Sequence, residues 1–245
     1  MPSLHDLSLN SSLFITNSVK TMEYPNLPYT PIVVHAGGLH CRPAKPLPQD
    51  LQQWISEAGT PGFILFSLGT VVKPSTMPEK YKKVLVDVFG SLEQRVLWKW
   101  DEITMDGLPS NVRLSKWLPQ QDILAHPELR LFITHGGLFS TQEASYHGVS
   151  ILGIPVSIDQ HHNMRMVQQE GWGRVLHWRD LSFDSLRNLI LQTMDDPRYQ
   201  LYNVDVWALL AAVIIVTSGL SFWLSYRILL FLVRCCFWSK KKKDD

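Results

Sequence analysis

The sequence predicts an α/β fold: a Rossmann-like parallel sheet followed by one C-terminal transmembrane helix. The first observation is an alternation, between residues 63 and 194, of short apolar runs with longer amphipathic stretches of helical period. Strands that alternate with helices form a parallel sheet with both faces covered. The second observation is that residues 206–225 carry no charge. About 20 apolar residues are enough to cross a bilayer core.

The predicted elements follow in chain order. Residues 1–31 are polar and interrupted by prolines, which indicates a linker. A short strand is expected at 32–34 and a helix at 50–58. Apolar runs then predict strands at 63–67, 95–100, 112–115, 131–134, 151–154 and 174–176. Apolar residues at helical spacing predict helices at 79–92, 121–125, 138–147, 162–170 and 182–194. We therefore assign residues 32–200 to one domain.

The composition narrows the class of partner. A net charge of +1 gives no reason to expect a nucleic-acid partner. The three cysteines, Cys41, Cys235 and Cys236, provide no disulfide framework. A metal centre needs converging ligands at defined spacing, and the neighbouring His161 and His162 point in different directions on a helix. We therefore expect neither a metal nor a cofactor.

Residues 206–233 form the expected membrane anchor, and residues 234–245 form a basic tail. Lys240–Lys243 follow the apolar run, and lysines beside a membrane span favour the cytosolic side. The folded domain is then expected on the other side of the membrane. The alternative, a buried core helix, fits poorly with an uncharged run followed by a lysine cluster.

The C-terminal lysines also indicate a location. Lys242 and Lys243 resemble the dilysine signal that returns membrane proteins to the endoplasmic reticulum, although a simple stop-transfer cluster is the alternative. Asn10 begins a glycosylation sequon, which is useful only if this end enters the lumen. We expect a single-pass protein of the endoplasmic reticulum membrane, with a lumenal domain and a cytosolic tail.

A Gly-Gly turn between a predicted strand and a predicted helix indicates an anion site. His135, Gly136 and Gly137 occupy this turn, and Ser140 lies in the first turn of the helix. Glycine lets the backbone approach an anion closely, and a helix start offers free N–H groups and a positive dipole end. A Gly-Gly turn alone indicates only tight packing, but with His135 before it we favour a phosphate group.

Other polar residues follow neighbouring strands, and ligands bind at the carboxyl ends of parallel strands. Trp117 offers a face for stacking a planar base, unless it is a core tryptophan. Gln120 suits a base edge or a ribose, and Glu143 suits ribose hydroxyls, unless it is a solvated helix residue. Asp159 and Gln160 suit the vicinal hydroxyls of a hexose, or cap the next helix. Together these residues predict a nucleotide-sugar site.

The span from Ile32 to about Tyr199 resembles the donor-binding half of the membrane-bound animal UDP-glycosyltransferases, the UDP-glucuronosyltransferase-like enzymes. The motifs that carry this resemblance are Gly37-Gly38-Leu39-His40, Phe66–Thr70, Trp117–Gln120, Phe132–Gly137, Ser140–Ala144, His147-Gly148 and Pro155–Gln160. Phe139 departs from the pattern, because many members have Asn there. The anchor and the dilysine tail match the same family.

The resemblance implies a GT-B glycosyltransferase, of which this chain is the C-terminal domain and residues 1–31 the end of the preceding half. The residues that match the family's contacts to the uracil, ribose, diphosphate and sugar are Ser67, Gly69, Trp117, Gln120, His135, Gly137, Ser140, Glu143, Asp159 and Gln160. It further implies an inverting transfer of glucose or glucuronic acid from a UDP-sugar to a small lipophilic acceptor, with no required metal.

The family's other half, which carries the acceptor pocket and the catalytic base, has no counterpart in this sequence, so we expect no catalytic residue here. Two interpretations stay open. The chain supplies the donor site and the anchor of a UDP-glycosyltransferase, or it is a truncated, non-catalytic isoform. Such an isoform would bind UDP-sugar, or form an oligomer with full-length family members and regulate them. An unstable fragment without a role is the remaining alternative.

Overall fold

The computed structural model describes residues 3–19, 29–195 and 204–244 and, within the C-terminal helix, the side chains of residues 209–228 and 230. Contacts group the chain into two compact units, Met1–Arg198 and Tyr199–Asp245. The C-terminal end of the predicted domain, residues 196–200, and the side chains of Lys242 and Lys243 lie outside the described parts.

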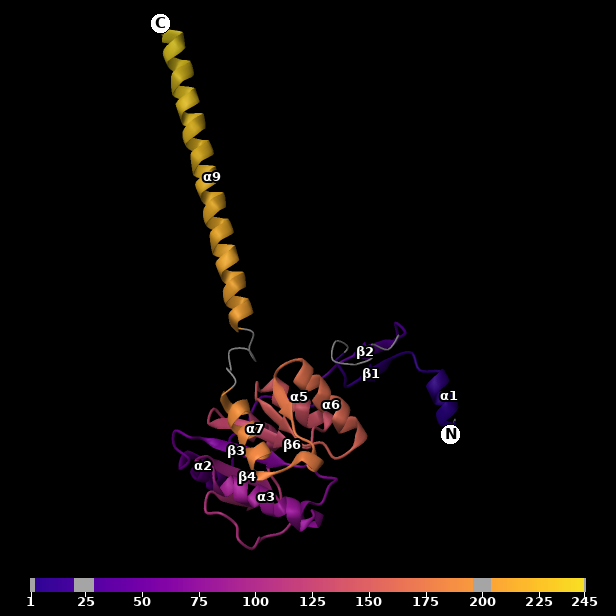
Figure 1. Ribbon diagram of the computed structural model, residues 1–245. Coiled ribbons are helices and arrows are strands. Elements are labelled where there is room, and N and C mark those ends of the chain that lie inside the picture. The colour runs from indigo at the N-terminus through magenta and orange to yellow at the C-terminus, as the bar shows by residue number, and fades with distance from the viewer. Residues whose placement is uncertain (1–2, 20–28, 196–203, 245) are drawn as a thin grey trace. The chain divides into compact units, whose positions relative to one another are not determined.

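A six-stranded, all-parallel sheet forms the centre of the first unit (Figure 1). Its strands are β3 (Phe63–Ser67), β4 (Arg95–Lys99), β5 (Val112–Ser115), β6 (Leu129–Thr134), β7 (Ile151–Gly153) and β8 (Gly173–Val175). They lie side by side in the order β5-β4-β3-β6-β7-β8. The predicted α/β fold with a parallel sheet is confirmed.

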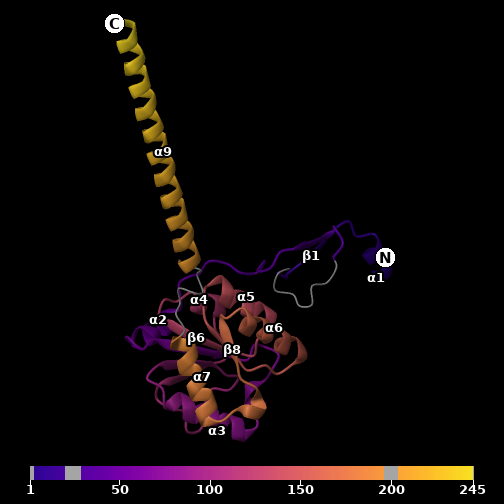
Figure 2. The ribbon, with the colours of Figure 1, turned by 45° about the horizontal axis from the view of Figure 1, so that its top comes forward.

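Helices cover both faces of this sheet (Figure 2). One face carries α3 (Glu79–Gly90) and α7 (Phe183–Asp195), and the other carries α2 (Gln49–Ser56), α4 (Gln120–Leu124), α5 (Leu138–Tyr146) and α6 (Ile158–Gln169). Alternate residues of a strand point to opposite faces, so Ile64 and Phe66 pack with α3 whereas Phe63 and Leu65 pack with α2. Short 3₁₀ turns, Pro74–Thr76 and Trp178–Asp180, lie in the connections.

The strand order reverses between β3 and β6, and this reversal positions the site. After β3 the chain adds β4 and β5 on one side, then returns to place β6 against β3. Ser67 and Thr134, the last residues of β3 and β6, are paired in register. Ligands of open parallel sheets bind at such a topological switch point, outside the carboxyl ends of the strands.

The N-terminal segment contains α1 (Leu4–Leu9), β1 (Phe14–Thr16) and β2 (Val33–His35). The sequence did not indicate α1, which begins with a capping box between Ser3 and Asp6. β1 and β2 form a separate two-stranded parallel sheet. Two strands alone are marginally stable, and Phe14, Ile15 and Val34 are 40%, 61% and 44% exposed. This small sheet therefore leaves apolar surface open.

The second unit contains the helix α9 (Val204–Asp244). Its segment Leu209–Ile228 has a mean hydropathy of 1.8, and none of it is buried within the structure. By length and composition this helix is able to cross a membrane, which agrees with the predicted apolar C-terminal helix.

One predicted boundary is wrong in a way that affects the site. The helix expected at 162–170 begins at Ile158. Ser157 is its N-cap, and the Gln160 side chain accepts hydrogen bonds from the backbone N–H groups of Val156 (2.8 Å) and Ser157 (3.0 Å). Asp159 and Gln160 therefore lie in the first helical turn rather than in a loop before it. Apolar spacing does not reveal this helix start, because the start is set by the cap.

Candidate functional site

His135 lies at the centre of the switch point, directly after β6. Its imidazole fills the space beside two glycines: a Cβ atom added to Gly69 or to Gly137 would come within 2.7 Å of the ring. Ser67, at the end of β3, is 2% exposed, and its hydroxyl accepts a hydrogen bond from the Gly69 N–H (3.3 Å). The structure thus brings together four of the predicted diphosphate residues. Only glycine leaves room for the ring on both sides.

Burial lowers the pKa of His135 below its ordinary value, and the charge of Lys99 acts in the same direction. The carboxylate of Asp159 and a hydrogen bond with the Ser67 backbone oppose this effect. The imidazole is therefore neutral near pH 7 and carries one N–H donor. A neutral donor beside the N-terminus of α5 suits a phosphate oxygen.

Lys99 also lies at the carboxyl edge of the sheet, although it was not predicted as a site residue. It is the last residue of β4, beside β3, and partial burial lowers the pKa of its ammonium group. A half-buried cation at the carboxyl end of a strand suits an anionic ligand. The available signal was a lysine at the end of an otherwise apolar run.

Gln120, Ser140 and Glu143 form a second cluster beside the first. The Gln120 Nε2 atom donates to Glu143 Oε2 (2.6 Å) and to Ser140 Oγ (3.1 Å). Glu143 is 9% exposed, so it is not a solvated helix residue. A buried carboxylate held by an amide keeps free acceptor sites for vicinal hydroxyls.

His40 also belongs to this cluster, although only its motif was singled out in the sequence. Its Nε2 atom lies 3.6 Å from Glu143 Oε1 and 3.2 Å from the Phe139 carbonyl oxygen. Its Nδ1 atom lies 3.2 Å from the Asn17 amide nitrogen. The His40 and Phe139 rings are in contact, with 4.5 Å between their centroids and a tilt of 33° between their planes. Phe139 thus holds His40 against the carboxylate.

An ion pair fixes the segment that carries His40. Arg42 donates to both oxygens of Asp122 (2.6 and 3.0 Å), and the Lys45 N–H donates to the same carboxylate (2.7 Å). These bonds hold the pKa of Asp122 below its usual range, with the Arg42 hydrogen bond as the largest cause. Gln121 adds bonds to the backbone of His40 and Arg42. The segment is therefore tied to α4, which also carries Gln120.

Trp117 stands at the outer end of the edge, after β5 and three residues before Gln120. Its side chain is 70% exposed, so the alternative of a core tryptophan is wrong. An exposed indole face is available for stacking on a planar base.

Asp159 and Gln160 lie at the opposite end, in the first turn of α6. Asp159 is exposed and accepts a hydrogen bond from the Ser157 hydroxyl (2.8 Å). The side-chain oxygen of Gln160, Oε1, already accepts hydrogen bonds from the backbone. This leaves the side-chain N–H groups of Gln160 as donors. The two alternatives for this pair, a helix cap and a ligand contact, thus apply to different residues. Gln160 caps the start of α6, and the exposed carboxylate of Asp159 is accessible to a ligand.

Comparison with known proteins identifies the family of this chain. A family profile described as UDP-glucoronosyl and UDP-glucosyl transferase matches residues 3–210. The chain is 36% identical over 200 residues to UDP-glycosyltransferase UGT5 of Dactylopius coccus, covering 82% of this chain. It is 37% identical over 190 residues to human UDP-glucuronosyltransferase 2B17, and 38% identical over 198 residues to mouse 2-hydroxyacylsphingosine 1-beta-galactosyltransferase, covering 78% and 81% of this chain.

Solved structures share the fold. The calicheamicin glycosyltransferase CalG4 has a TM-score of 0.60 at 20% identity, over 78% of this chain and 46% of its own. The spinosyn forosaminyltransferase SpnP has a TM-score of 0.62 at 20% identity, over 77% of this chain and 48% of its own.

The match covers only part of each relative. This chain spans 38% of the length of the Dactylopius protein, 35% of the human protein and 36% of the mouse protein. The family profile nevertheless covers most of this chain. The protein therefore belongs to the family of UDP-glucuronosyl and UDP-glucosyl transferases.

Proposed function

We propose that the carboxyl edge of the sheet binds a UDP-sugar, and that the chain supplies the donor site of a UDP-glycosyltransferase. The cluster of Gln120, Ser140 and Glu143 carries this proposal, because it is a buried, hydrogen-bonded carboxylate site at the same edge as the exposed Trp117 and the half-buried His135. Trp117 would stack on uracil, Gln120 and Glu143 would hold the ribose, and His135 would donate to the diphosphate.

The remaining residues complete the donor contacts. Ser67, Gly69, Gly137 and Ser140 would surround the diphosphate, with Lys99 as a further cation. Asp159 would accept from the hexose hydroxyls, and Gln160 would donate through its amide. The sugar is proposed to be glucose or glucuronic acid.

The proposed reaction is an inverting displacement that needs no metal or cofactor. A base outside the described residues removes the proton of an acceptor hydroxyl, and the oxygen attacks the anomeric carbon. The bond from that carbon to the diphosphate breaks, and UDP leaves with the bonding electrons. The N-terminus of α5 and His135 would stabilise the negative charge that grows on UDP. The acceptor is proposed to be a small lipophilic alcohol or phenol.

We further propose that α9 spans the endoplasmic reticulum membrane, with the sheet domain lumenal and the lysine tail cytosolic. The support is the length and composition of Leu209–Ile228, followed by Lys240–Lys243. Asn10, exposed at the end of α1, would then be glycosylated, and Lys242 and Lys243 would act as a retrieval signal.

Paired ligands test the donor site. In the full chain, Glu143→Gln should weaken UDP binding about tenfold or more, because hydrogen bonds to a charged acceptor are lost. The same variant should leave the binding of 2′,3′-dideoxy-UDP unchanged, because that ligand lacks the ribose hydroxyls. Isothermal titration measures both affinities, with the exposed Glu170→Gln as the matched control. Equal losses for the two ligands would overturn the assignment of Glu143 to the ribose.

A second candidate function is regulation of full-length family members by direct contact. The exposed apolar residues Phe14, Ile15 and Val34 on β1 and β2 favour it, because exposed apolar surface marks interaction sites. Co-expression tests it: a tagged chain should retain a full-length relative, and Ile15→Lys should abolish this retention.

A further inference from the structure

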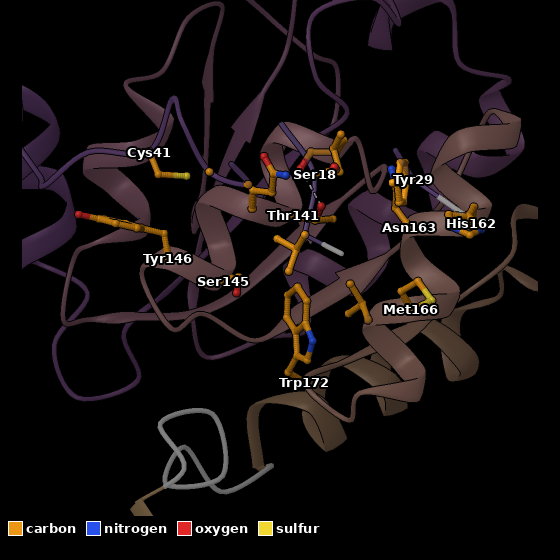
Figure 3. Close-up of a pocket in the computed structure, with 16 residues that line it drawn as sticks. Ser18, Tyr29, Cys41, Thr141, Ser145, Tyr146, His162, Asn163, Met166 and Trp172 are labelled. Carbon is orange, nitrogen blue, oxygen red and sulfur yellow. Dashed lines mark hydrogen bonds between the residues drawn. The ribbon is translucent and has the colours of Figure 1, made fainter. Parts of the chain in front are cut away.

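Asn17 fixes the N-terminal segment to the sheet domain. A cavity of about 640 Å³ lies between this segment and the helices α5 and α6 (Figure 3). Its lining includes Ser18, Tyr29, Thr141 and Ser145. Asn17 directly precedes Ser18, and its carbonyl oxygen accepts a hydrogen bond from Gln142 Nε2 (3.0 Å). The backbone of Asn17 is therefore held against α5 beside the cavity.

The side chain of Asn17 is held by the segment that follows β2. A Cβ atom added to Gly37 would collide with the Val19 side chain, so glycine is needed for the two segments to approach this closely. The Asn17 Oδ1 atom accepts hydrogen bonds from the N–H groups of Gly38 (2.7 Å) and Leu39 (3.3 Å). These two bonds fix the orientation of the Asn17 amide.

The Asn17 amide sets the tautomer of His40. Because the amide oxygen faces the backbone, its Nδ2 atom faces His40 Nδ1 at 3.2 Å, and an amide nitrogen can only donate. His40 Nδ1 is therefore an acceptor, and the neutral ring carries its hydrogen on Nε2. Two acceptors lie near Nε2, the Phe139 carbonyl oxygen at 3.2 Å and Glu143 Oε1 at 3.6 Å. The Cys41 Sγ atom is farther away, at 3.9 Å.

The carboxylate of Glu143 thus has a donor at each oxygen. Gln120 Nε2 donates to Oε2 (2.6 Å), and the His40 N–H faces Oε1. At 3.6 Å the second contact is longer than a hydrogen bond, so it acts mainly through charge. Both side chains are mostly buried, which limits screening by water. A chain of contacts therefore runs from Asn17 through His40 to the carboxylate.

We propose that Asn17 and His40 are positioning residues of the ribose site. His40 holds Glu143 Oε1 in one fixed direction, and Asn17 keeps the hydrogen on the His40 nitrogen that faces this oxygen. Both residues act through Glu143 and not through the nucleotide. This role rests on the proposed contact of Glu143 with the ribose, and it makes recognition of the ribose depend on the N-terminal segment.

Two substitutions of His40 distinguish positioning from simple packing. His40→Asn retains an acceptor for Asn17 but is too short to reach Glu143, whereas His40→Gln places an amide N–H near the position of Nε2. In the full chain, His40→Asn should weaken UDP binding about fivefold, because one favourable contact is lost, and His40→Gln should keep it within about twofold. Both should leave the binding of 2′,3′-dideoxy-UDP unchanged, because that ligand lacks the ribose hydroxyls.

Isothermal titration measures these affinities, and circular dichroism verifies that each variant is folded. His5→Asn, exposed on α1, is the matched control and should change neither affinity. Equal losses for UDP and 2′,3′-dideoxy-UDP would indicate a general disturbance and overturn the proposal. The same UDP affinity in His40→Asn and His40→Gln would also overturn it.

A double-mutant cycle tests the contribution of Asn17. Asn17→Ala alone should weaken UDP binding about threefold, because the hydrogen of His40 can then move to Nδ1. In the His40→Asn background the same substitution should cause no further loss. Asn188→Ala, exposed on α7, should have no effect in either background. Additive losses from Asn17→Ala and His40→Asn would overturn the role of the tautomer.

The wild-type chain separates the positioning role from the proposed function. If it binds UDP more tightly than 2′,3′-dideoxy-UDP and His40→Asn keeps full UDP affinity, only the positioning role is overturned. If the wild type binds the two ligands equally, or does not bind UDP, the assignment of Glu143 to the ribose is overturned together with this role.

Discussion

At the residue scale, the protonation of His135 links the stability of the fold to its ligand. The ring lies between Gly69 and Gly137, and its burial disfavours the imidazolium form. An unfolded chain has no such burial, so it takes up the proton at a higher pH. The same packing that keeps the imidazole neutral therefore makes the fold sensitive to mild acid.

The sign of this effect follows from linkage. The unfolded state binds more protons than the folded state below about pH 6.5, so the free energy of unfolding should fall as the pH drops through that value. For His135 alone the slope is at most about 1.4 kcal/mol per pH unit. His135→Asn should reduce the slope, while the lowered pKa values of His126 and His147 preserve part of it.

Urea unfolding between pH 7.5 and 5.5 measures this slope, with the exposed His5→Asn as the control. An unchanged slope in His135→Asn would mean that the native site tolerates the charged ring.

Much of the candidate site could be predicted from the sequence at this scale. Trp117, His135 and Asp159 each follow an apolar run, and the carboxyl ends of parallel strands meet at one edge. The contact of His40 with Glu143 could not be predicted, because it depends on how the segment after β2 packs against α5. The apolar neighbours of Lys99 marked it as unusual. A single lysine at the end of a strand is nevertheless too common to predict a ligand contact.

At the element scale, the start of α6 explains why boundaries are harder to predict than elements. The six strands of the main sheet lie within a few residues of their predicted positions, because buried strands require continuous apolar runs. The exposed β1 was not predicted. The first turn of α6 is instead set by Gln160 and its backbone bonds. No apolar spacing marks that turn. The same reason hid α1, which consists of Leu4–Leu9 and is exposed where its side chains are described.

The two residues of this turn should therefore respond differently to substitution. Gln160→Met should lower the free energy of unfolding by about 0.5–2 kcal/mol without any ligand, the usual effect of losing a helix cap. Asp159→Asn should leave stability nearly unchanged but weaken UDP-glucose relative to UDP. Chemical unfolding and titration with both nucleotides measure this, with Gln169→Met at the far end of α6 as control. Loss of UDP binding itself in Asp159→Asn would contradict the assignment to the sugar.

At the scale of the whole molecule, the sequence predicted the class of fold but not the order of its strands. The alternation of strands and helices indicates a parallel sheet. The reversal between β3 and β6 arises from pairing between residues far apart, such as Ser67 with Thr134. The ion pair between Arg42 and Asp122 is likewise a tertiary contact. No local sequence pattern predicts it.

The proposed location is tested by the lysines at the C-terminus. The full chain in cells should carry one glycan on Asn10, its single sequon, and the glycan should stay sensitive to endoglycosidase H. Lys242→Ala with Lys243→Ala should produce a resistant glycan, because the chain would leave the endoplasmic reticulum. Lys240→Ala with Lys241→Ala removes the same charge and should not. An unglycosylated Asn10 would contradict the lumenal orientation.

The central claim is that the carboxyl edge of the sheet is an intact UDP site, and thermal unfolding of the full chain with and without UDP tests it most directly. At a UDP concentration of 100 times its dissociation constant, binding should stabilise the fold by about 2.7 kcal/mol. The rise in melting temperature should disappear in Trp117→Ala at the same concentration, while Ile103→Ala, an exposed apolar residue in another loop, should keep it. A cooperative transition that ignores UDP, or an equal rise in Trp117→Ala, would contradict the claim.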